Sequence, residues 1–284
     1  MFLDWKGGNF MLELPESKTI CRQAEDVLRG KTIVKVVSNQ SPHKFAWFRG
    51  NPEEYAALLR GKTIGQSTAY GGMVEIAVKE MRLIFADGVN LRYFAPNEPL
   101  PKKHQLLLEF EDGSSLLGSV QMYGALWALS PGQEETYNLI ARSKPDPLSD
   151  DFSEEYFHRL YGEQDGKLSV KAFLATKQRI PGLGNGVLQD ILFHARLHPK
   201  RKMNTLTSED FPRLYHAVTQ TLLEMTLKGG RDTERDLFGC SGGYRTILSA
   251  KTKDQPCPVC GGKIRREAYL GGNVYYCPNC QPLE

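Results

Sequence analysis

Short apolar runs dominate the first half of the chain. They are KTIVKVV, MVEIAV, MRLIFA, HQLLLEF and SVQMYGALWAL, and Gly, Asp, Asn and Pro residues separate them. Apolar and β-branched runs of this length predict strands, and Asp112-Gly113 between two of them predicts a hairpin turn. Strands spaced this closely favour a β-sandwich or barrel.

Helical spacing dominates the second half. The segments SEEYFHRLYG, LSVKAFLAT, GVLQDILFHAR and SEDFPRLYHAVTQTLLEMTLKGG each repeat apolar residues with a period near 3.6. We expect Ser208 to start the last helix and Gly229-Gly230 to end it. A further helix is expected near the N-terminus, with Gly30 at its C-terminal end. Residues 231–256 are rich in Gly, Thr, Ser and charge, which predicts a mobile or extended connector.

The composition is that of an ordinary globular protein, with 40% hydrophobic and 24% charged residues in 284. This length suffices for two domains and a small module. No apolar run reaches the roughly 18 residues that span a bilayer, and MFLDWKGGNF lacks the basic and apolar segments of a signal peptide. We therefore expect a cytoplasmic monomer without a membrane partner.

Positive charge gathers in the second half. Residues 1–150 hold 17 Lys and Arg against 18 Asp and Glu, whereas residues 151–284 hold 19 against 15. Between 171 and 202, seven basic side chains oppose only Asp190. Such a patch attracts polyanions, although by itself it fits a solvated helical face equally well.

Four of the six cysteines form two C-x-x-C pairs, and sixteen residues separate Cys257 and Cys260 from Cys277 and Cys280. In a cytosolic chain this spacing indicates a metal site rather than disulfides. Each tight turn presents two thiolates, and a hairpin between the pairs would close a tetrahedron. Four protein ligands leave no open position, so we expect one structural Zn²⁺ per chain. A redox role for either pair is the lesser alternative.

A glycine-rich turn, residues 180–186 (IPGLGNG), separates two helical segments. Its glycines let backbone amides approach a ligand, and amides at the start of the helix at 186–196 would suit a phosphate. The basic segment HPKRK follows at the far end of that helix. A plain corner between helices is the usual alternative. No strand precedes the turn, so a nucleotide cofactor is not expected.

Four segments carry a resemblance to a known family. IPGLGNGVLQDILFHARLHPKRK resembles the helix–two-turns–helix motif of the formamidopyrimidine-DNA glycosylase/endonuclease VIII family. CPVCGGKIRREAYLGGNVYYCPNCQ resembles its zinc finger, LELPE its amino terminus, and EPLPKKHQLLLEFEDG a strand pair of its N-terminal domain. The resemblance spans roughly residues 11–281.

The resemblance implies an α+β protein that binds bent, damaged double-stranded DNA in the cleft between two domains. The implied organisation is an extension at 1–10, a β-sandwich domain with flanking helices at 11–142 and a linker at 143–151. A helical DNA-binding domain at 152–235 and a connector with a four-cysteine zinc finger at 236–284 complete it.

The sequence departs from the family at the nucleophile. The family uses the free secondary amine of an N-terminal proline to form a Schiff base, which permits base loss and strand cleavage. Leu12 stands at the matching position behind eleven residues, and a peptide nitrogen is not nucleophilic. Initiation at Met11 would leave a free amine one residue out of place. Glu13 matches the family's acid/base glutamate.

Other positions also depart from the family. Gly72 aligns with a catalytic lysine and Gly272 with a phosphate-binding arginine. Val89, Met122 and Tyr123 take the places of the three residues that fill the void left by an everted nucleotide. The resemblance nevertheless implies a set of DNA-binding residues: Lys171, Gly184, Asn185, Lys200, Arg201 and Lys202, with Met122 and Tyr123.

These observations leave three hypotheses. The first is a DNA-repair protein that binds damaged DNA and excises a base with water activated by Glu13, without efficient strand cleavage. The second is a non-enzymatic nucleic-acid-binding protein that recognises bent or unpaired structure. The third is a glycosylase and lyase that uses another amine, for example Lys6.

Overall fold

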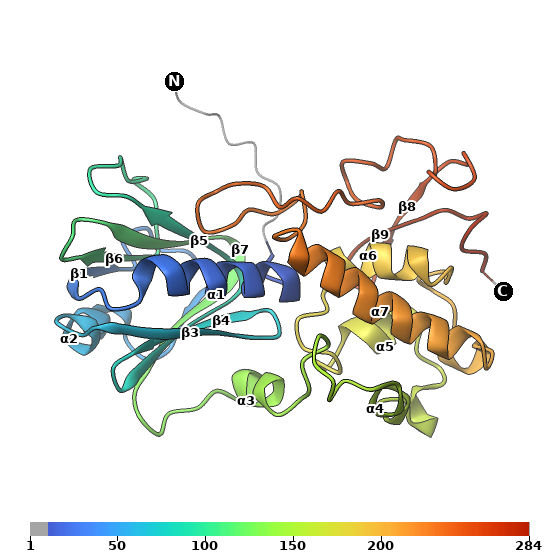
Figure 1. Cartoon of the computed structure of the whole chain (residues 1–284), viewed down its shortest axis with the longest axis horizontal. Coiled ribbons are helices and arrows are strands. Elements are labelled where there is room, and N and C mark those ends of the chain that lie inside the picture. The colour runs from blue at the N-terminus through green and yellow to red at the C-terminus, as the bar shows by residue number, and fades with distance from the viewer. Residues whose placement is uncertain (1–10, 284) are drawn as a thin grey trace.

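The computed structural model describes residues 11–283, which form two halves joined side by side (Figure 1). The predicted extension at 1–10, with Lys6, lies outside the described residues. The strands are β1 (Ile33–Ser38), β2 (Ala46–Phe48), β3 (Ile64–Tyr70), β4 (Met73–Val78), β5 (Met81–Phe94), β6 (Leu106–Phe110), β7 (Ser115–Leu129), β8 (Arg265–Tyr269) and β9 (Gly272–Tyr276). The helices are α1 (Leu14–Leu28), α2 (Tyr55–Leu59), α3 (Thr136–Arg142), α4 (Glu154–Arg159), α5 (Val170–Ala175), α6 (Asn185–His194) and α7 (Asp210–Leu227). Short 3-10 turns lie at Pro52–Glu54, Glu163–Asp165 and Met203–Thr205.

Seven strands of the N-terminal half hydrogen-bond in one sheet, in the order β1-β6-β7-β5-β4-β3, with β2 parallel to β7. The long strands β5 and β7 pair with each other in the middle of this order. The register of their pairing shifts between Asp87 and Val89 of β5. Such bulges bend a strand. Leu83 from one part of β5 and Leu91 from the other therefore share one core with Leu108 of β6. The predicted sandwich is confirmed as two layers around a common core.

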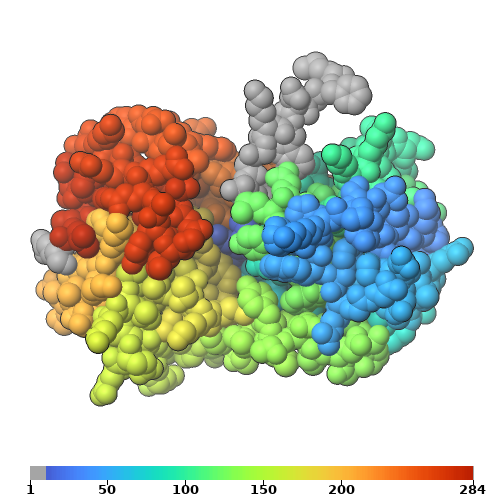
Figure 2. Space-filling model, turned by 180° about the vertical axis from the view of Figure 1, so that it is seen from behind, coloured from blue at the N-terminus to red at the C-terminus, as the bar shows by residue number. Residues whose placement is uncertain are grey.

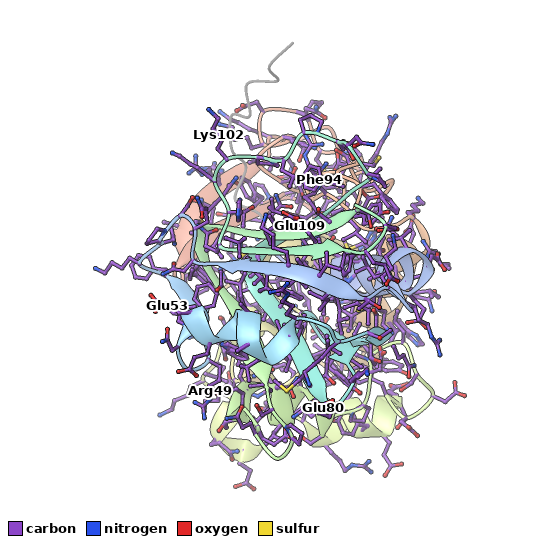
Figure 3. The ribbon with its side chains drawn as sticks, turned by 90° about the vertical axis from the view of Figure 1, so that its left-hand side faces the viewer. Arg49, Glu53, Glu80, Phe94, Lys102 and Glu109 are labelled. Atoms are coloured by element: carbon purple, nitrogen blue, oxygen red, sulfur yellow. The ribbon has the colours of Figure 1, made fainter. Side chains whose placement is uncertain are left out.

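The end of this half shows how that core is closed (Figure 3). Strand β6, which carries Glu109, lies on one side of β1, and α2 lies on the other. Tyr55 of α2 is fully buried, and its hydroxyl donates a hydrogen bond to the Leu126 carbonyl. Strands β2 and β3 and helices α2 and α3 were not predicted, because their apolar runs are short.

Helices α4 to α7 enclose a second core in the C-terminal half, which includes Phe157, Phe173, Leu188 and Leu214. The expected start of the last helix at Ser208 is wrong. Helix α7 begins at Asp210, whose side chain accepts a hydrogen bond from the Thr207 amide. Its expected end is confirmed by left-handed backbone at Gly229 and Gly230.

The segment 231–256 is extended, but it is anchored in both cores. Leu237 is fully buried in the core of the N-terminal half, and Tyr244 is buried in that of the C-terminal half. The segment predicted as a mobile or extended connector is thus held to both halves by isolated buried residues, to which sequence composition gave no weight.

Helix α1 joins the two halves. It contributes Ile20, Ala24 and Leu28 to the first core and Leu14 to the second. Figure 1 shows its first residues beside the end of α7.

A buried charge cluster lies at this junction. The Arg231 guanidinium donates to both carboxylate oxygens of Glu16 and lies 3.5 Å from Glu13 and 3.9 Å from Glu234. All four residues are buried. Burial lowers the pKa of Arg231, but the three carboxylates outweigh it and hold that pKa well above its ordinary value. Burial raises the pKa of Glu234 to about 7, so the cluster can hold a proton near neutral pH.

We predict that Arg231→Met lowers the free energy of unfolding by roughly 3–5 kcal/mol, because it leaves buried carboxylates without their counter-ion. Urea unfolding would measure the loss. Arg159→Ala is the matched control, since Arg159 forms only an exposed pair with Glu155 and should change little. An Arg231→Met protein as stable as the wild type would contradict this role.

Candidate active site and zinc centre

A cavity of about 120 Å³ lies where the two halves meet. Leu12, Glu13 and Asp87 line it from the N-terminal half, and Gln178 and Gly184 line it from the C-terminal half. Figure 2 shows the furrow between the halves, with the dark blue of the first described residues visible inside it. Leu12, matched from sequence to the family nucleophile, and the glycine-rich turn therefore line one cavity.

The Leu12 nitrogen is part of a buried hydrogen bond. Its N–H donates to the Asp87 carbonyl at 2.7 Å, and its side chain packs into the first core. The nitrogen is a peptide amide, and resonance delocalises its lone pair into the neighbouring carbonyl. The nitrogen that matches the family's nucleophilic amine thus serves as a structural donor.

Glu13 is held at the first turn of α6. Its Oε1 accepts from the Gly186 amide at 2.8 Å and its Oε2 from the Val187 amide at 2.7 Å. Burial raises the pKa of Glu13, whereas Arg231 and these two amides lower it. A carboxylate at a helix N-terminus is stabilised by the unpaired amides there.

The glycine-rich turn makes room for this contact. A β-carbon on Gly184 would lie 2.5 Å from Glu13 Oε1, and one on Gly186 would lie 1.5 Å from Arg231 Nη1. The amides of Gly186 and Val187, at the start of α6, were expected to bind a phosphate. Both instead donate to Glu13, which corrects that expectation. The sequence alone could not show that the anion at the start of α6 is the carboxylate of Glu13 from the same chain.

The backbone at Gly72 lies too close to Leu12 for a larger residue to fit. A β-carbon there would lie 2.6 Å from the Leu12 carbonyl oxygen. The backbone thus leaves no space for a lysine side chain, in keeping with the alignment of Gly72 with the family's lysine.

The expected void-filling residues differ in their surroundings. Val89, which the sequence match places at one of these positions, is fully buried in the first core. Met122 is 42% exposed, and the Tyr123 ring lies 5.7 Å from that of Trp47. Burial, and then the charges of Asp87 and Glu13, raise the pKa of Tyr123.

Lys171 and Asn185 meet the β8–β9 hairpin beside the cavity. Lys171 Nζ donates to the Tyr269 carbonyl at 2.7 Å, and Asn185 Nδ2 donates to the Asn273 carbonyl at 3.0 Å. Gly272, which aligns with the family's arginine, faces Asn185. The buried Asn185 Oδ1 has no partner among the described residues.

The basic side chains of 200–202 have partners within the protein. Lys200 pairs with Glu267, Arg201 lies 3.0 Å from Asp210, and Lys202 Nζ donates to the Lys167 carbonyl. Two of the three charges are thus compensated by acids from outside the 171–202 segment. That compensation could not be read from the local charge count.

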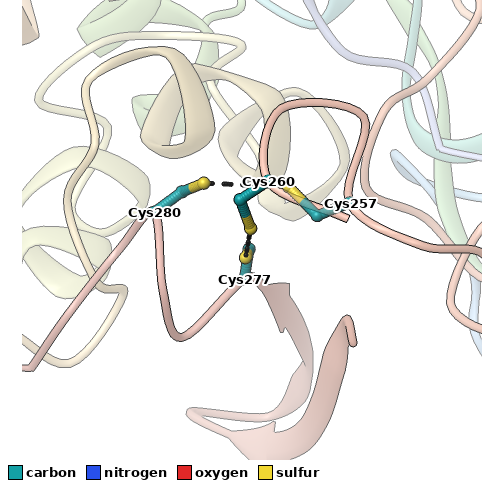
Figure 4. Close-up of side chains that lie close together, drawn as sticks. All are labelled: Cys257, Cys260, Cys277 and Cys280. Atoms are coloured by element: carbon teal, nitrogen blue, oxygen red, sulfur yellow. Dashed lines mark hydrogen bonds between the residues drawn. The ribbon is translucent and has the colours of Figure 1, made fainter. Parts of the chain in front are cut away.

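The four cysteines converge on one point (Figure 4). Their sulfur atoms all lie within 4.8 Å of one another, with 3.4 Å between Cys260 and Cys277 and 3.8 Å between Cys257 and Cys280. Zinc–sulfur bonds of about 2.3 Å in a tetrahedron place sulfurs ~3.8 Å apart. The residues therefore fit one structural Zn²⁺, as predicted.

Buried polar side chains attach the zinc finger to α6. Gln281 accepts from the Cys277 amide and donates to the Leu197 carbonyl. Asp190 accepts from the Ile247 and Leu248 amides just before the finger. The hairpin that contacts Lys171 and Asn185 is thus fixed to the same helix that binds Glu13.

Comparison with known proteins identifies this architecture. Residues 11–118 match the formamidopyrimidine-DNA glycosylase N-terminal domain, residues 144–236 its H2TH domain, and residues 254–283 the zinc finger found in FPG and IleRS. These matches define a protein of the helix–two-turns–helix, zinc-finger class.

Individual relatives extend over nearly the whole chain. The formamidopyrimidine-DNA glycosylase of Bacillus licheniformis is 30% identical, covering 95% of this chain and 99% of that protein. The chain belongs to the formamidopyrimidine-DNA glycosylase family. The MutM structure from Thermus thermophilus is similar at 27% identity with a TM-score of 0.79, covering 96% of this chain and 99% of that one.

The fold is also that of Lactococcus lactis Fpg bound to DNA containing N7-benzyl-Fapy-dG. That structure has a TM-score of 0.81 at 23% identity, covering 95% of this chain and 99% of its own. Between residues 11 and 283, none of the helices combines the length and apolar character needed to cross a bilayer.

We predict close to one zinc per chain by atomic absorption, and loss of the finger's fold on chelation, because so small a hairpin has little core of its own. Removal should also abolish binding to duplex DNA, since the hairpin contacts Lys171 and Asn185. Cys21→Ser is the control, as Cys21 is buried far from the four ligands in the first core. Zinc-free protein that binds DNA normally would refute this role.

Proposed function

We propose that this chain binds damaged double-stranded DNA in base excision repair and releases the damaged base by hydrolysis, without the Schiff base and strand cleavage of its family. The observation that carries this proposal is the hydrogen bond from the Leu12 amide to the Asp87 carbonyl. Covalent catalysis needs a free amine, and this nitrogen is a buried amide donor.

The DNA-binding part of the proposal rests on the corner formed by Lys171, Asn185 and the zinc-finger hairpin. Lys171 retains two N–H donors after its bond to Tyr269, because an ammonium group carries three. Asn185 presents an amide beside it. Family membership adds that relatives of this architecture are glycosylases, and a Lactococcus relative has been solved with lesion-containing DNA.

Met122 and Tyr123 complete the proposed interface. An exposed methionine next to a tyrosine that packs at a tilt against a tryptophan suits insertion between bases. Glu13 remains the family's acid/base candidate, although both of its oxygens already accept backbone hydrogen bonds.

A second candidate function is non-enzymatic recognition of bent or unpaired nucleic acid. The contacts of Glu13 and Arg231 hold the two halves together and need no catalytic role to explain them. An assay of base release and DNA binding separates the two candidate functions.

We predict that duplexes containing 8-oxoguanine or a formamidopyrimidine lose the damaged base, whereas borohydride traps no protein on duplexes with an abasic site. Chromatography would measure base release, and gel electrophoresis would detect trapped protein. A relative known to be trapped by borohydride would be the positive control. A trapped adduct would overturn the hydrolytic route, and mapping it would test Lys6. Tight binding with neither product would favour the second candidate.

We further predict that replacing Lys200, Arg201 and Lys202 by alanine flattens the dependence of DNA affinity on salt. Each lost phosphate contact should reduce the slope of log K against log salt by ~0.9. Fluorescence anisotropy at several salt concentrations would measure it. Arg159→Ala and Arg29→Ala, on exposed helical pairs, are the controls. An unchanged slope in the triple variant would show that these residues do not contact DNA.

A further inference from the structure

Asp87 is the second carboxyl group of the cavity at Leu12. The residue lies at the bulge in β5, where its backbone carbonyl accepts from the Leu12 amide, and it is part of the cavity lining. Glu13 lines the same cavity from the following position of the chain. No sequence pattern pointed to Asp87, because Val89 was the residue matched to the family in this part of the strand.

The two carboxyl groups differ in their surroundings. Both oxygens of Glu13 accept backbone hydrogen bonds, and Arg231 lies near one of them. Within residues 11–283, the Asp87 carboxylate forms no ion pair or hydrogen bond, and burial is the cause that raises its pKa. Asp87 therefore has oxygens available to a ligand, whereas Glu13 has its oxygens committed to the protein.

The cavity has room for a nucleophile. Its volume of about 120 Å³ accommodates several water molecules. A water there would lie beside Asp87 and at the place where the family's amine attacks. A carboxylate within hydrogen-bond reach of such a water can act as a general base.

We propose that Asp87 is the general base that activates water for base release, and that Glu13 is a positioning residue that fixes α1 against α6. This inference rests on the proposed hydrolytic function. In the step, the water oxygen bonds to C1′ of the damaged nucleoside while the C1′–N bond breaks. Asp87 takes a proton from the water. The base leaves with the electron pair of the broken bond and takes a proton from solvent, leaving an abasic sugar.

A purely structural role for Asp87 predicts different behaviour. Its φ of +59° lies in the left-handed region, which asparagine and glycine adopt more readily than other residues. Asp87→Asn and Asp87→Gly should therefore preserve the bulge. Both remove the carboxylate and keep the backbone carbonyl that accepts from Leu12.

The first test measures single-turnover base release and DNA affinity for Asp87→Asn. General-base catalysis is worth roughly 10²–10⁴-fold, so base release should fall by that factor. Affinity for lesion DNA should stay within a few fold, because no contact to phosphate is removed. Asp254→Asn, at an exposed aspartate, is the control and should behave like the wild type.

The second test is chemical rescue. Asp87→Gly opens space beside the cavity, and added formate should restore base release at least ~10-fold, because a small carboxylate can replace the missing base. Formate should not stimulate the wild type or Glu13→Gln. Rescue depends on proton transfer, so a residue with only a structural role would not respond.

The outcomes separate this inference from the proposed function. A wild type that releases bases, with Asp87→Asn equally active, overturns the role of Asp87 and leaves hydrolysis standing. Folded, DNA-binding Asp87→Gly that formate does not rescue overturns it as well. A wild type that binds lesion DNA and releases no base overturns hydrolysis itself, and the role of Asp87 with it.

Discussion

The placement of Glu13 at the start of α6 is the constraint on which the site depends. A buried carboxylate requires compensation, which the Gly186 and Val187 amides and the Arg231 guanidinium supply. Because Glu13 precedes α1 and its partners belong to the C-terminal half, this one contact sets how the halves meet. The glycines at 184 and 186 follow from it, since a β-carbon at either position would collide with the buried charges.

A contact needed for folding does not by itself demonstrate catalysis. Glu13 would be retained by any protein that keeps these two halves together, whether or not it reacts with DNA. The same reasoning applies to Arg231 and to the Lys171 and Asn185 contacts with the hairpin. Leu12 is more informative for the proposed hydrolytic route, because its nitrogen is a peptide amide that donates a hydrogen bond to the Asp87 carbonyl.

The sequence predicted what depends on local patterns and missed what depends on long-range contacts. Strands β1, β4 and β6, parts of β5 and β7, the C-terminal ends of α1 and α7 and the zinc ligands follow from periodicity, glycine and cysteine spacing. The charge cluster joins residues more than 200 positions apart, so no local pattern could reveal it. The anchoring of 231–256 by Leu237 and Tyr244 was hidden by a polar composition, and the pairing of Arg201 with Asp210 by a local charge count.

Gly272 begins strand β9 of the hairpin, at the position matched from sequence to a phosphate-binding arginine of the family. Gly272 supplies no charge, yet the backbone around it accepts hydrogen bonds from Lys171 and Asn185 through the Tyr269 and Asn273 carbonyls. At this end of the hairpin the backbone therefore orients these two side chains, and position 272 itself adds no cation. Lys171 is also buried, which lowers its pKa and holds its ammonium group in one place. An ammonium group that is already held in place loses less conformational entropy when it binds a phosphate. In the proposed DNA complex, the fixed position of Lys171 would offset part of the affinity that a cation at position 272 would add.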